Sequence, residues 1–64
     1  MKEEIKLWLI DMYESEIEEM EKTISNCRIW ERGYDGEDPN PYTENIATID
    51  EYIDILREKI EELK

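Results

Sequence analysis

The sequence predicts an all-α fold, an antiparallel two-helix hairpin with coiled-coil-like packing that pairs with a second copy to form a four-helix bundle. Two series of apolar residues recur at alternating steps of three and four positions. The first series is Ile10, Tyr13, Ile17, Met20, Ile24 and Cys27, and the second is Ile46, Ile49, Ile53, Leu56, Ile60 and Leu63. This spacing places each series along one narrow stripe of an α-helix. If the chain folds back, the stripes pair in opposite order, from Cys27 with Ile46 to Ile10 with Leu63.

The first helix is expected over residues 2–32, because neither Gly nor Pro interrupts this stretch. Glu3 and Glu4 suit the positive end of the helix dipole at the start, and Arg32 suits the negative end. Gly33 follows and is expected to stop the helix.

A linker is expected over residues 33–40, which hold both glycines and one of the two prolines among acidic turn formers. The second helix is then expected over 41–64, with Asn40 as its N-cap and Pro41 at its first position. Thr43 is the competing cap. A linker of this length favours local closure over a swapped dimer.

Charges beside the seam support the pairing within one chain. With Ile10 and Ile53 assigned to heptad position a, the flanking residues of the two helices face each other across the seam. The expected contacts are attractive between Glu14 and Arg57 and between Glu16 and Lys59, and repulsive between Glu21 and Asp50.

The composition limits the classes of partner. The 64 residues form one domain at most, 42% of them are charged, and the net charge is −11. Such a chain repels bare nucleic acid and anionic membranes and is attracted to basic surfaces. A second copy or another partner is expected, because two helices alone bury little apolar area.

The single cysteine, Cys27, excludes a disulfide within the chain and occupies a position in the apolar seam. Without a histidine to activate it, the thiol is expected to act as a small core residue. Small secreted domains usually depend on several disulfides, and no apolar run is long enough to span a membrane. These features indicate a cytoplasmic protein.

Apolar residues outside the seam indicate interaction surfaces. Ile5, Leu7, Trp8 and Leu9 belong to the part of the first helix that projects beyond the second, and the apolar stretch continues to Met12. Tyr52 and Ile55 share a lateral face with Ile5, Leu9 and Met12, which favours a homodimer, whereas the alternative is that Trp8 and its neighbours anchor a different protein. Near the turn, Trp30 and Tyr42 are expected to form a small local core or a recognition tip.

Acidic residues follow both helices, including six between Asp11 and Glu21 without a base among them. Carboxylates spaced along a rigid rod can imitate the phosphates of a nucleic acid and occupy a basic groove. We therefore expect an acidic inhibitor or adaptor that docks on a basic protein surface, in the manner of virus-encoded (phage-like) antagonists of host defence. The expected partner-binding residues are Trp8, Leu9, Met12, Glu14, Glu18, Glu19, Glu21, Trp30, Tyr52 and Ile55.

One arrangement of carboxylates suggests an alternative. Glu18 and Glu21, with Glu51 and Asp54, form a Glu-x-x-Glu and a Glu-x-x-Asp motif that resembles the magnesium site of the all-α nucleotide pyrophosphatases of the MazG type. The resemblance implies a magnesium-dependent enzyme. The heptad positions direct Glu18, Glu51 and Asp54 to solvent, however, and the chain has no histidine and no nucleophile with a base. We therefore expect no enzyme, cofactor or metal site, and a purely structural helical dimer is the other alternative.

Overall fold

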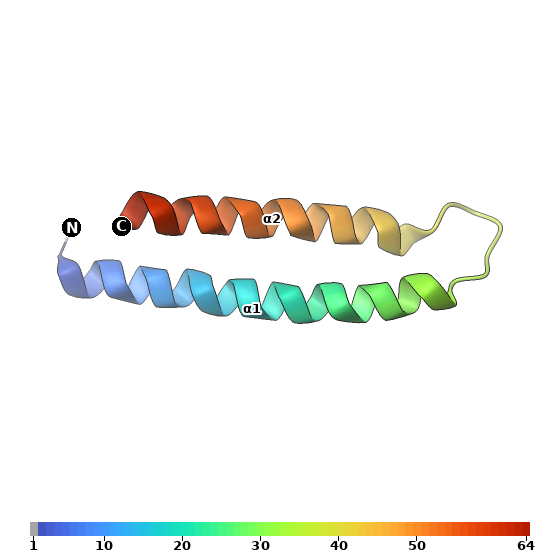
Figure 1. The fold of residues 1–64 in the computed structure, drawn as a ribbon, viewed down its shortest axis with the longest axis horizontal. Coiled ribbons are helices and arrows are strands. Elements are labelled where there is room, and N and C mark those ends of the chain that lie inside the picture. The colour runs from blue at the N-terminus through green and yellow to red at the C-terminus, as the bar shows by residue number, and fades with distance from the viewer. Residues whose placement is uncertain (1) are drawn as a thin grey trace.

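The computed structural model describes residues 2–64 and consists of two helices, α1 over Glu3–Gly33 and α2 over Pro41–Leu63. The helices run antiparallel and side by side, and the start of α1 and the end of α2 lie opposite the linker (Figure 1). The predicted all-α antiparallel hairpin is confirmed. Because α1 has 31 residues and α2 has 23, the first turns of α1 extend beyond the end of α2.

The core is the predicted seam. Its twelve residues are all buried or partly buried, and Ile24, Cys27, Ile53, Leu56 and Ile60 are the most enclosed. Even Ile53 and Leu56 keep 4% of their surface exposed, and no side chain of the described residues is completely enclosed. The hairpin is therefore held by one line of apolar contacts, with solvent on both sides.

The end of α1 differs from the prediction by one residue. Gly33 is the last helical residue instead of a stop signal outside the helix, and Tyr34 is the C-cap. The N–H of Tyr34 donates to the carbonyl oxygen of Glu31 at 3.3 Å, and no described residue has a positive φ. The last turn therefore closes without the left-handed conformation that makes glycine the usual terminator.

Asn40 starts α2 and also ties it to α1. Its Oδ1 accepts a hydrogen bond from the Tyr42 N–H at 3.0 Å, which confirms Asn40 as the N-cap. Its Nδ2 donates to the carbonyl oxygen of Glu31 at 2.9 Å. Thr43 is not the cap, and its hydroxyl donates to Oε2 of Glu31 at 2.6 Å. Glu31 therefore fixes the register of the two helices at the turn.

No helix within residues 2–64 combines the length and the apolar character needed to cross a membrane.

The Leu56→Ala substitution tests the seam. We expect it to lower the free energy of unfolding by about 3 kcal/mol, because it removes a buried side chain from a line of contacts that has no second layer. Leu7→Ala is the matched control, because Leu7 is 53% exposed and should change the free energy of unfolding by less than about 0.5 kcal/mol. Urea unfolding followed by circular dichroism measures both. Equal effects of the two substitutions would show that the seam is not the core.

Candidate interaction surfaces

Two lateral faces flank the seam, and heptad position f of each helix, which includes Trp8 and Ile29, lies on the side opposite the seam. The apolar face carries heptad positions c and g and consists of Ile5, Leu9, Met12, Glu16, Glu19, Thr23, Asn26 and Trp30 of α1 with Asn45, Thr48, Tyr52, Ile55, Lys59 and Glu62 of α2. The charged face carries positions b and e and consists of Glu4, Leu7, Asp11, Glu14, Glu18, Glu21, Ser25, Arg28 and Arg32 of α1 with Thr43, Ala47, Asp50, Asp54, Arg57 and Glu61 of α2. The two faces thus differ sharply in their content of charge.

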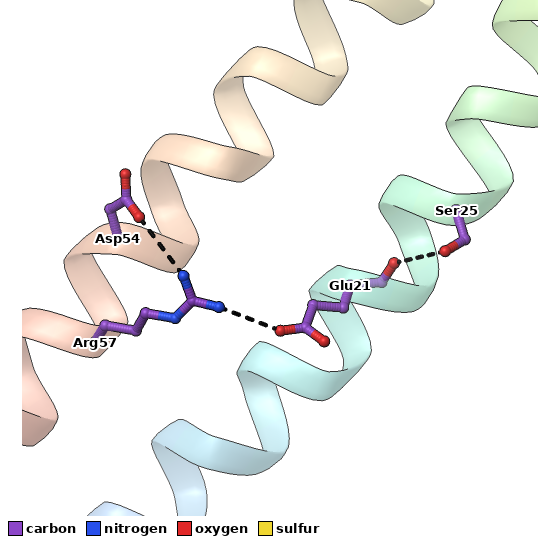
Figure 2. Close-up of polar contacts among 4 residues, drawn as sticks. All are labelled: Glu21, Ser25, Asp54 and Arg57. Carbon is purple, nitrogen blue, oxygen red and sulfur yellow. Dashed lines mark hydrogen bonds and ion pairs between the residues drawn. The ribbon is translucent and has the colours of Figure 1, made fainter.

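An ionic cluster around Arg57 lies on the charged face (Figure 2). Its Nη2 is 3.4 Å from Oε1 of Glu21 across the seam, and its Nη1 is 3.9 Å from Oδ1 of Asp54 on its own helix. The Ser25 hydroxyl donates to the carbonyl oxygen of Glu21 at 3.2 Å. Since all three ionic side chains are at least half exposed, these ion pairs orient the helices more than they stabilise them.

The ion pair between Arg57 and Glu21 differs from the contacts that were expected across the seam. Arg57 pairs with Glu21, whereas the heptad positions alone had placed it opposite Glu14. Helical side chains lean toward the N-terminus of their own helix, so in an antiparallel pair Arg57 and Glu21 lean toward each other. Glu21 therefore makes an attractive contact with Arg57 that the heptad positions do not predict.

Tyr52 and Glu16 meet on the apolar face, although Lys59 was the expected partner of Glu16. Loss of hydration, the negative charge of Glu16 and a hydrogen bond to its carboxylate, in that order, raise the pKa of Tyr52 above its ordinary value. The phenol therefore stays neutral beyond its usual pH range. This contact reduces the electrostatic cost of a carboxylate on a mainly apolar surface.

Large apolar side chains lie exposed at three places on or beside the apolar face. Trp8 and Met12 are 67% and 61% exposed near the start of α1, where they border a shallow depression of about 510 Å³. Ile55 is 49% exposed on α2, and Leu9 is half-buried. Near the turn Trp30 lies 5.8 Å from Tyr42 between ring centroids but remains 54% exposed, so the expected local core covers this indole only in part.

The acidic residues expected to bind a partner all lie exposed on α1. Glu19 is 3.7 Å from the ammonium group of Lys22, and Glu21 is paired with Arg57. Within residues 2–64 no ion pair involves Glu14 or Glu18. These two carboxylates are open to a cation from outside the chain.

The four carboxylates that resemble a magnesium site do not converge. Among the described residues, no three Asp, Glu, Cys or His side chains come together in a way that could hold a metal ion. Glu18 and Glu51 are exposed, and the guanidinium of Arg57 lies between Glu21 and Asp54 (Figure 2). The arrangement offers charged surface instead of a coordination site.

The chain matches no family model, no curated protein and no solved structure. A functional interpretation of this hairpin therefore depends on the chemistry of its two lateral faces.

The polar contacts of Glu31 and of Tyr52, like the ion pair of Arg57 with Glu21, were not anticipated from the sequence. Glu31 occupies an a position at the end of the seam stripe, where a carboxylate is ordinarily unfavourable, and this is a signal that a donor such as the Thr43 hydroxyl contacts it. Asn40 donates instead to the backbone carbonyl oxygen of Glu31. No feature of the sequence predicts the contact of Tyr52 with Glu16, because other acidic and large side chains also flank the seam at several levels.

The pH dependence of Tyr52 tests the contact on the apolar face. We expect its pKa to lie above 10.0 and to move toward that value in Glu16→Gln, because the substitution removes the negative charge. A raised folded-state pKa means that the contact contributes stability below pH 10 and loses it as pH rises through the folded-state pKa. Carbon NMR of labelled tyrosines resolves the titration of each ring. Glu14→Gln on the charged face is the control and should leave Tyr52 unchanged, and an equal shift in both variants would contradict the contact.

Proposed function

We propose that this chain is a non-enzymatic protein-interaction module, an acidic inhibitor or adaptor that docks its charged face on a basic protein surface. The observation that carries the proposal is the segregation of charge between the two lateral faces of a rigid rod with a Cα extent of 53 Å. A partner with a basic groove of matching length, such as one that otherwise holds nucleic acid, has the complementary electrostatics.

Exposed carboxylates at Glu14 and Glu18 support this proposal. They project from a helix whose backbone is already ordered, so binding costs little conformational entropy beyond that of the side chains. Glu21 lies close by on the same face and holds Arg57 through a weak, exposed ion pair. A basic partner can exchange this internal cation for one of its own at small cost.

The apolar face supports a second part of the proposal, in which the hairpin pairs with another copy to form a four-helix bundle. A single line of seam contacts leaves large apolar side chains in water, and a second layer removes them from it. The free thiol of Cys27, buried in the seam, is consistent with a reducing compartment, and we place the protein in the cytoplasm.

Affinity capture from an extract of the native cell tests the docking surface. We expect a partner with a basic surface to be retained at low salt and released at high salt, because exposed charges are screened. Glu14→Gln combined with Glu18→Gln should weaken binding of the purified partner at least about tenfold. The matched control is Glu37→Gln combined with Asp38→Asn in the linker, which removes the same charge elsewhere and should bind normally. An affinity that is indifferent to salt, or equal losses in both variants, would rule out docking through this face.

Sedimentation velocity tests the dimer. We expect a dimer at micromolar concentration and, in Trp8→Ala, a dissociation constant raised at least about tenfold, because a symmetric dimer loses the indole twice. Leu7→Ala is the control, since Leu7 is also exposed but belongs to the charged face. Helical circular dichroism should persist in both variants. A folded wild-type monomer at that concentration would contradict the proposed bundle.

A further inference from the structure

The apolar side chains beside the seam recur at a fixed interval along α1. Trp8 and Leu9 occupy heptad positions f and g, and Ile29 and Trp30 occupy the same two positions three heptads later. At 1.5 Å of rise per residue, the two pairs are about 31 Å apart on one side of the helix. Trp8, Ile29 and Trp30 are each more than half exposed.

A third apolar group lies between these pairs and comes from α2. Tyr52 and Ile55 are 40% and 49% exposed on the apolar face. The predicted seam register, in which Ile17 lies opposite Leu56, places them level with Glu21 and Glu18 of α1. They are therefore about 16 Å from either pair along the axis, close to midway.

Three apolar groups at equal spacing form a self-complementary pattern. A two-fold axis that passes through the central group at right angles to the helices exchanges the two outer groups. An isologous dimer interface has this property, because each contact must occur twice with its members exchanged. A pattern made for an unrelated partner has no reason to be symmetric about its own centre.

We propose that the apolar face binds a second copy of this chain in the opposite direction. The Trp8 end of each copy covers the Trp30 end of the other, and Tyr52 and Ile55 of both copies meet at the axis. This arrangement rests on the proposed four-helix bundle and specifies its contact face and its orientation.

The charges on the apolar face are compatible with this arrangement. Its charged members are Glu16, Glu19, Lys59 and Glu62. Glu16 lies beside the phenol of Tyr52. Glu19 lies close to the axis, so the two copies bring their Glu19 carboxylates near each other, and Lys22 at 3.7 Å from each Glu19 offsets part of this repulsion. The antiparallel arrangement brings the uncharged Thr48 and Asn45 of one copy near Lys59 and Glu62 of the other. Most of the net charge of −11 stays outside the contact.

The size of the face suits a stable dimer. The Cα atoms of the hairpin extend over 53 × 15 × 10 Å, and the broad side contains both helices. A face of these dimensions is large enough for the roughly 800 Å² of accessible surface that each partner contributes to a standard protein–protein interface. A parallel arrangement of the two copies is less favourable, because it places the apolar Leu9 and Met12 of one copy opposite the carboxylate of Glu62 of the other. It also leaves the outer apolar groups without an apolar group to contact.

Spin labels on the charged face distinguish the two orientations. Glu4 and Glu18 lie on this face, away from the proposed contact. Two proteins are made in the Cys27→Ala background, one with Glu4→Cys and one with Glu18→Cys, so that each carries a single spin label at its new cysteine. The distance between the two labels of a dimer is measured by pulsed electron paramagnetic resonance. In the antiparallel arrangement the Glu4 labels are more than about 45 Å apart, whereas the Glu18 labels near the axis are closer by at least about 20 Å. Circular dichroism verifies that the labelled proteins remain helical.

The outcomes test the orientation of the two copies separately from the existence of the dimer. Equal distances at the two sites would overturn the antiparallel arrangement while leaving the dimer in place. An absence of dipolar coupling at both sites, with a monomer in sedimentation, would overturn the bundle as well. Trp30→Ala gives an independent measurement, because it should weaken the dimer about as much as Trp8→Ala if the two ends meet. A dimer that depends on Trp8 but not on Trp30 would also overturn the proposal.

Discussion

The interlocking of two apolar stripes is the interaction on which the rest of this structure depends. Each stripe follows one side of a helix, and neither can be removed from water without the other. Because the stripes pair along a single line, the contact orders both helices without enclosing any described side chain completely. The same line determines which residues flank it, and so it determines the content of the two lateral faces. A change in register by one heptad would bring different charges and different aromatic rings together.

The sequence was sufficient to predict most of this architecture, since seam spacing, the Asn40 cap and Pro41 are strong local signals. It was less informative about contacts between long side chains. Arg57 reaches Glu21 because helical side chains lean toward their N-termini, a directional effect that heptad labels do not contain. Gly33 continues the helix because the backbone closes through Glu31 without a left-handed residue. The candidate surfaces were visible as apolar and acidic residues left over from the seam, but a list of such residues does not identify what covers them.

Charge and apolar area are divided between opposite sides of one thin molecule. This division allows two kinds of association at once, since the forces involved differ in range and in their response to salt. Contact between apolar faces depends on release of water and is nearly indifferent to ionic strength, whereas attraction between carboxylates and a basic surface is screened by ions. Two copies joined through their apolar faces would display acidic surfaces on both outer sides, which doubles the number of sites offered to a partner.

The hydrogen bonds around Glu31 also have a kinetic consequence. Asn40 is only nine positions from Glu31 in the chain, so the first contact between the helices closes a short loop at little entropic cost. Later contacts can form in sequence from the turn outward, each brought close by the one before it. A hairpin whose contacts form in this order folds rapidly, because its early contacts are local in the sequence. The same order in reverse makes the ends far from the turn the first to fray, and the indole of Trp8 is therefore carried on the segment that opens most often.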